Sequence, residues 1–285
     1  MKSLVVLALL APALAHADPD ADDTATATAT TAVKVAPPPA KKRRLYVRLG
    51  VAYLHPFSSS GPLTLANVDG AASLAVKDGP IAGSGTTIDS STVPAAIIGY
   101  TLPILNDRLS IETILGTPIP VKFEATGTLA NQSLAPTALG IPTGVMALGP
   151  QLGEAKGVPP VVTAVYALRD SPTLVPYVGA GVSVLFAYDA QVTNPTLTMA
   201  GKPDMSISPA PGLVLQTGID ARIWNRVYAR IDVKFIALMQ ANAEVDHIQI
   251  QTPELPLFGN VEVGTAKMSV WVNPLIVQAG IGANF

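Results

Sequence analysis

Apolar and polar residues alternate with a period of two over most of the chain from Leu45 onward. Between Val227 and Met239 every odd-numbered residue is apolar, whereas the even-numbered positions include Arg230 and Asp232. This alternation is typical of β-strands with one apolar face. Repeats of the pattern predict eight strands, at residues 46–55, 92–104, 108–119, 158–168, 174–188, 212–224, 226–243 and 261–285. The second and fourth strands are apolar on both faces, so alternation alone leaves their orientation open.

The spacers between these strands are alternately short and long. The short ones are 105–108, 169–173 and 224–226, and the long ones, rich in Gly, Pro, Ser, Thr and Ala, are 56–91, 120–157, 189–211 and 244–260. An outer-membrane barrel has this layout, with short turns in the periplasm and long loops outside. We therefore predict an all-β fold, an eight-stranded antiparallel transmembrane β-barrel of the outer-membrane type. A secreted β-sandwich, whose strands also alternate, is the alternative.

Composition favours the barrel over the sandwich. Hydrophobic residues make up 49% of the chain and charged residues only 13%, about half of the roughly 25% that is usual in soluble domains. After the first fifteen residues, no uninterrupted apolar run reaches the roughly 18 residues that a membrane helix needs. The absence of cysteine excludes thiolate metal sites and cysteine nucleophiles, and the net charge of −2 gives no case for a nucleic-acid partner.

The N-terminal residues predict export and a tail before the barrel. Lys2, the apolar stretch after it and a small-x-small site have the order of a cleavable signal peptide, assigned to residues 1–17. Residues 18–44 are acidic, then rich in Thr and Ala, then rich in Pro, which predicts a disordered, low-complexity periplasmic tail. The barrel is assigned to residues 45–285, and we expect it in the outer membrane of a Gram-negative-type bacterium.

Alternate positions of each strand face the barrel interior, and strand direction gives their height. The polar floor candidates, near the periplasmic end or the middle, are Arg48, Glu112, Asp220, Arg222, Arg230, Asp232, Lys234 and Gln278. The apolar lumen candidates, in the outer half, are Leu54, Ile114, Leu185, Val214, Ile236 and Leu238. Because an eight-stranded barrel has room only for side chains or one small ligand, the charges are expected to pair and close the floor. The apolar half is expected either to hold a hydrophobic guest or to be simply packed.

Six stretches resemble the OmpW family of small outer-membrane proteins, which includes the AlkL-type importers. They are YVRLGVAYLHP (46–56), LNDRLSIETILGTPI (105–119), LGEAKGVPPVVTAVYAL (152–168), VPYVGAGVSVLFAYD (175–189), GLVLQTGIDARI (212–223) and NPLIVQAGIGANF (273–285). The resemblance implies a barrel that admits small hydrophobic or detergent-like molecules from outside. With its floor blocked, such a barrel releases them sideways into the membrane lipid. The final Phe285 resembles the C-terminal signal that the barrel assembly machinery recognises.

Our leading hypothesis is a passive channel or receptor for small hydrophobic molecules, without cofactor, metal or enzymatic activity. A structural or surface-recognition barrel is the alternative, in which the long loops contact phage, bacteriocin or host. A lipid A-modifying enzyme is a further alternative. It would need a base such as His55, which lies beside Pro56 and Ser58–Ser60 at the predicted outer mouth. No phosphate-binding or paired metal-binding motif is present.

Overall fold

The structure, a computed structural model, describes residues 43–169 and 173–285. The predicted signal peptide and all but the end of the predicted tail lie outside the described residues. The described part consists mainly of β-strands, with a few short helices. No helix within it is long and apolar enough to cross a membrane.

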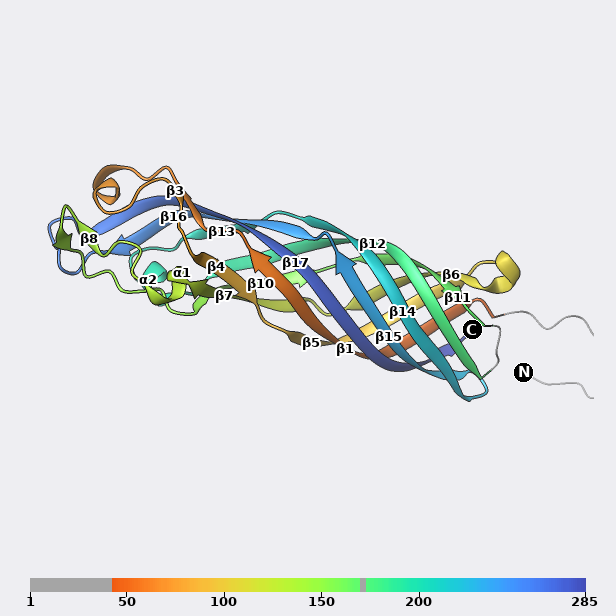
Figure 1. The fold of residues 1–285 in the computed structure, drawn as a ribbon. Helices are drawn as coiled ribbons and strands as arrows, with labels where there is room; N and C mark the ends of the chain where they lie inside the picture. The colour runs from red at the N-terminus through yellow and green to blue at the C-terminus, as the bar shows by residue number, and fades with distance from the viewer. Residues whose placement is uncertain (1–42, 170–172) are drawn as a thin grey trace, which may run out of the picture. The chain divides into compact units, whose positions relative to one another are not determined.

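Eight strands are joined side by side into a closed antiparallel ring (Figure 1). They are β1 (Leu45–Ser60), β5 (Ser91–Thr101), β6 (Leu109–Gly116), β11 (Val161–Ala167), β12 (Leu174–Val192), β14 (Ala210–Trp224), β15 (Val227–Ala237) and β17 (Asn260–Asn284). Each strand pairs with its neighbours in this order, and β17 pairs with β1, which closes the ring. The predicted eight-stranded barrel is confirmed.

The connections at one end of the barrel are short, as predicted. The 3-10 helix η2 (Leu105–Asp107) joins β5 to β6, and a turn at Asn225 and Arg226 joins β14 to β15. The first and last strands begin and end here, because Tyr46 is opposite Asn284. The two strands approach so closely that a Cβ on Gly50 would overlap the backbone of β17.

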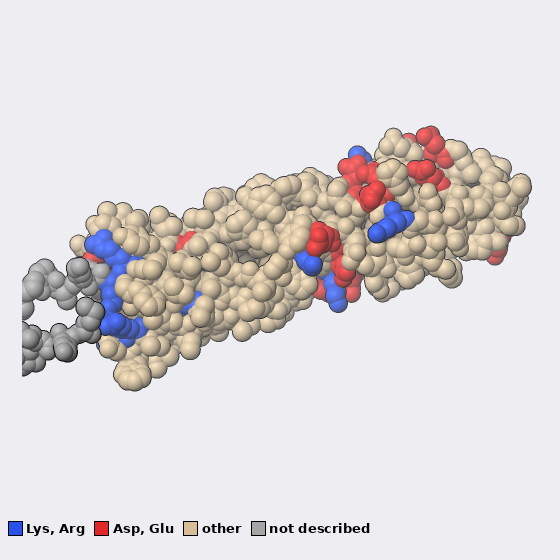
Figure 2. Space-filling model, turned by 180° about the vertical axis from the view of Figure 1, so that it is seen from behind, with Lys and Arg blue, Asp and Glu red and all other residues tan. Residues whose placement is uncertain are grey.

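Side chains on the outer face of the ring form an apolar belt. Its exposed members include Leu49, Val51, Ile111, Leu115, Val162, Val182, Leu213, Leu215, Ile231 and Ile281. Such a face fits hydrocarbon, because lipid tails cannot hydrogen-bond to polar side chains. Figure 2 shows the belt as a zone almost free of charge between the basic end of the barrel and the charged groups farther out. Trp224 and Phe285, both exposed, lie at its edge, where aromatic girdles occur.

The long spacers were predicted as loops, but they continue the barrel outward as strands. The added elements are β2 (Thr64–Ala66), η1 (Gly70–Leu74), β3 (Gly79–Pro80), β4 (Ser84–Ile88), β7 (Ile119–Gly127), α1 (Thr128–Asn131), β8 (Thr137–Ala138), β9 (Ile141–Pro142), β10 (Gln151–Val158), α2 (Pro195–Thr198), β13 (Asp204–Ile207) and β16 (Gln240–Gln251). One run of pairing is β4–β7–β10–β12, and a second is β12–β13–β16–β17–β2–β3.

We call these elements and the outer ends of β1, β12 and β17 the outer extension, which points away from the strand ends near the C-terminus in Figure 1. A strand needs about 9–11 residues to cross a bilayer. Because β17 has 25 residues, much of its length lies beyond the membrane.

Candidate functional site

The barrel interior near the termini is filled by polar and charged side chains, which we call the charged layer. Glu112 lies at its centre and is 1% exposed. Its carboxylate accepts hydrogen bonds from Tyr46 Oη at 2.5 Å and Arg230 Nη1 at 2.7 Å. Gln216 Nε2 donates a third, at 2.8 Å. A carboxylate taken out of water needs such partners, because an uncompensated buried charge is costly.

Two aspartates complete the pairing of charges. Asp220 accepts hydrogen bonds from Arg230 Nε at 2.9 Å and Arg48 Nη2 at 3.2 Å. Asp232, fully buried, is paired with Lys234. Three cations therefore balance three carboxylates, so the charged layer has no net charge.

Seven of the eight predicted floor residues lie in this layer, namely Arg48, Glu112, Asp220, Arg230, Asp232, Lys234 and Gln278. Arg222 is not part of this layer: its side chain is exposed near the end of β14, just before the pairing with β15 becomes irregular. The sequence analysis missed Tyr46, Gln216 and Tyr177, whose Oη donates to Asp232 at 2.6 Å. These three follow the same inward alternation as the charges, so the period of two could have found them.

A cluster of buried apolar side chains lies next to the charged layer, on its outer side. Leu54, Val214 and Ile236 belong to it, and Ile114 and Leu185 pack against it. Five of the six predicted apolar lumen residues are therefore in the interior. Contacts among these side chains pack part of the space between the strands.

The prediction for Leu238 is wrong, because this side chain points outward and is 64% exposed. Between β15 and β16, the chain advances five positions from Phe235 to Gln240, whereas the opposite strand advances four, from Leu275 to Trp271. This extra residue is a β-bulge, and Leu238 adopts a φ of 60° within it. The bulge shifts the alternation by one, so Met239, expected to face outward, is buried inside.

The lower cavity, about 70 Å³ in volume, lies beside this apolar cluster. Leu54, Leu185, Ile236 and Met239 contribute to its wall from different strands around the barrel. Its wall is mostly apolar, as the sequence predicted for this half of the lumen.

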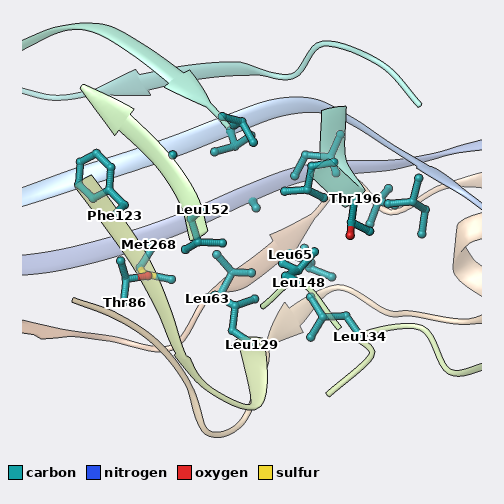
Figure 3. A pocket seen from close by; sticks show the side chains of 18 of the residues that line it. Leu63, Leu65, Thr86, Phe123, Leu129, Leu134, Leu148, Leu152, Thr196 and Met268 are labelled. Carbon is teal, nitrogen blue, oxygen red and sulfur yellow. The ribbon is translucent and has the colours of Figure 1, made fainter. Parts of the chain in front are cut away.

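The upper cavity, about 140 Å³ in volume, lies within the outer extension (Figure 3). The side chains that line it are apolar except for the hydroxyls of Thr86 and Thr196. Leu63 and Leu129 reach it from two different spacers, and Met268 reaches it from β17. The sequence analysis missed this cavity because most of its wall lies in segments predicted as loops. The one available signal was the alternation of the last strand, which marks Met268 as inward.

One face of β17 passes both cavities and ends in the charged layer. Met268 and Val270 line the upper cavity, and Val272 and Ile276 line the lower one. Gln278 lies in the charged layer. At about 3.4 Å per residue, the ten steps from Met268 to Gln278 span roughly 34 Å of strand. This wall is therefore apolar from the outer extension to the charged layer.

His55 lies on the exposed side of β1, away from both cavities. Its Nδ1 is 2.8 Å from Ser90 Oγ, and its ring lies 6.5 Å from that of Tyr53 and 5.0 Å from that of Phe57. Within residues 43–169 and 173–285, no group of three or more His, Cys, Asp or Glu side chains could hold a metal ion.

Comparisons with known proteins agree with this architecture. The OmpW family model matches residues 63–285. The crystal structure of the outer membrane protein OprG from Pseudomonas aeruginosa is 19% identical, with a TM-score of 0.64, and the match covers 85% of this chain and 96% of that one. The solid-state NMR structure of AlkL in lipid bilayers is 18% identical, with a TM-score of 0.48, and the match covers 88% and 94%.

A relative from Sinorhizobium fredii, the uncharacterized outer-membrane protein y4mB, is 26% identical over 205 residues. The match covers 72% of this chain and 71% of the relative. The chain belongs to the OmpW family and is a β-barrel of the bacterial outer membrane.

Proposed function

We propose that the protein is a passive channel for small hydrophobic molecules, which enter through the outer extension and leave sideways into the membrane. The observation that carries this proposal is the apolar wall of β17, which lines both cavities in turn. A water-filled pore for polar solutes has a polar interior instead. Apolar walls favour a guest that gains free energy by leaving water.

The charged layer supports a closed floor below the cavities. The guanidinium of Arg230 lies 4.5 Å from the ring centre of Tyr177 and 5.5 Å from that of Tyr46, in addition to its two carboxylate partners. An eight-stranded barrel is just wide enough for such side chains to fill it. An apolar molecule that passed this point would have to separate buried ion pairs, which is costly. The proposed exit is therefore through the wall.

A gap in strand pairing near the lower cavity supports this exit. The pairing of β1 with β5 stops at Leu54, and no strand pairing joins the next residues of β1 to β4 in the described part. Hydroxyls bridge the two strands instead: Ser60 Oγ accepts from Thr86 N–H at 2.8 Å. Ser58 Oγ accepts from Ile88 N–H at 3.3 Å. We call this line of contact the seam.

The seam lies at the wall of the lower cavity, because Pro56 and Ile88 from its two sides both line that cavity. Side-chain bridges can separate without breaking a continuous backbone ladder, as an exit requires. Phe57, 54% exposed on the same strand, faces outward at this height.

Uptake of radiolabelled toluene by intact cells tests the channel. Ile236→Asn places an amide in the apolar interior, and we expect uptake to fall toward that of cells without the protein. Leu238→Asn is the matched control, because Leu238 lies two residues away and points outward. Both variants must be present in the outer membrane in equal amounts. Normal uptake by Ile236→Asn would contradict the proposal, and the recognition alternative predicts that outcome.

A reversible crosslink tests the sideways exit separately. Ser58 Oγ and Thr87 Oγ1 are 3.1 Å apart across the seam, and the chain has no cysteine of its own. A Ser58→Cys/Thr87→Cys disulfide should lower toluene uptake, and a reductant should restore it. Ala221→Cys/Ala229→Cys, at an opposed pair of β14 and β15, is the control. Full uptake through a crosslinked seam would refute the exit but leave the channel standing.

A further inference from the structure

Among the residues that line the upper cavity, Thr86 has a buried hydroxyl without a hydrogen-bond partner. Thr86 lies on β4 opposite Ala125 of β7, and its backbone N–H donates to Ser60 Oγ at 2.8 Å. The residue is 7% exposed, and its Oγ1 has no hydrogen-bond partner among the described residues. In Figure 3, Thr86 and Thr196 lie on opposite sides of the view, with leucine side chains between them.

Two nearby threonine hydroxyls of the outer extension do have partners. Thr87 Oγ1, the next residue on β4, lies 3.1 Å from Ser58 Oγ. Thr128 Oγ1 donates to the carbonyl of Ala82 at 2.8 Å. A buried hydroxyl without a partner loses its hydrogen bonds to water and gains nothing in exchange. Valine has nearly the same shape and would remove this cost, so Thr86 is an unfavourable choice for a wall that is only hydrophobic.

We infer that the upper cavity selects small neutral molecules with a hydrocarbon body and one hydroxyl group, and that Thr86 Oγ1 hydrogen-bonds to this hydroxyl. The inference rests on the proposed channel and names the substrate class of its upper part. A threonine hydroxyl both donates and accepts, so it pairs with an alcohol or a phenol in either direction. No charged side chain lines the cavity, so an ionised head group would lose its hydration without compensation.

The size of the cavity limits the guest. Its volume is about 140 Å³, and a dry protein cavity of about 150 Å³ holds one benzene molecule. A single aromatic ring with a one-carbon substituent is therefore a suitable probe. Toluene and benzyl alcohol are such a pair, because they differ by one hydroxyl and share the ring.

The test uses the full-length barrel in lipid nanodiscs with 13C-labelled methionine methyl groups. Met205 and Met268 line the upper cavity and report binding there, whereas Met239 lines the lower cavity. Thr86→Val should weaken benzyl alcohol binding at the upper methionines by about 5- to 10-fold, the size of one hydrogen bond. Toluene binding should not weaken. Each ligand partitions into the bilayer to the same extent for all variants. The ratio of binding strengths between two variants therefore reports the effect of the protein alone.

Two further variants separate recognition from structure. Thr86→Ser keeps the hydroxyl and should retain benzyl alcohol binding, which also keeps the inference testable if Thr86→Val does not fold. Thr126→Val, at an exposed threonine of β7, should change the binding of neither ligand. If Thr86→Val weakens the binding of both ligands equally, or of neither, the inference is overturned. Binding of toluene to the wild type would still support the channel. If neither ligand shifts the methyl signals of Met205 and Met268 in the wild type, the inference and the upper part of the channel both fail.

Discussion

Replacing Glu112 by Gln removes one of the three carboxylates that neutralise the charged layer. The side chain keeps its shape but loses its charge, so the layer changes from neutral to a net charge of +1. Arg230 loses its 2.7 Å partner and retains Asp220, whose Oδ1 lies 2.9 Å from its Nε. At least one of the donors that faced the Glu112 carboxylate would now meet the Gln amide nitrogen, which cannot accept a hydrogen bond.

The magnitude follows from this loss. Breaking a buried ion pair by removing one partner costs about 3–5 kcal/mol, and the remaining Asp220 places the expected loss at the lower end, about 3 kcal/mol. With a urea dependence of roughly 2 kcal/mol per molar, the unfolding midpoint should fall by roughly 1.5 M. Removing both partners, as in Glu112→Gln/Arg230→Met, should restore much of this stability, because no uncompensated charge remains.

Urea unfolding in lipid vesicles, followed by tryptophan fluorescence, measures the effect. Lys156→Gln is the control: Lys156 pairs with Asp189 at 2.9 Å, but both side chains are more than half exposed, so no measurable shift is expected. A loss of less than about 1 kcal/mol in Glu112→Gln would refute the reasoning, because a paired, water-free layer could not tolerate the change so easily.

Three further outcomes are expected. A Cβ on Gly99 would overlap the ring of Tyr46, so Gly99→Ala should displace that ring from Glu112 and lower stability by about 1–3 kcal/mol in the same urea assay. Deleting Phe285 should lower the amount of folded protein in outer-membrane fractions, because we propose that the assembly machinery reads this residue; normal assembly would count against that role. Expression should leave the mass of lipid A unchanged, whereas a mass change abolished by His55→Ala would establish the enzyme alternative.

The sequence by itself determined the eight barrel strands and the faces of most of them. Lipid demands an apolar outer side and the pleat repeats every two residues, so alternation alone placed Ile281 outside and Gln278 inside. It also placed the charges near one end of the barrel, since strand direction is fixed by the order of short and long connections.

Only the tertiary structure decided which inward side chains meet. Glu112 and Arg230 are 118 positions apart, and their contact depends on the register of strands that no local pattern encodes. A single bulge reversed the faces of Leu238 and Met239, because one inserted residue shifts a period of two by half a cycle. The upper cavity likewise exists only because spacers distant in the sequence pair and enclose it. The sequence analysis predicted those spacers as loops because they are rich in Gly, Pro, Ser, Thr and Ala.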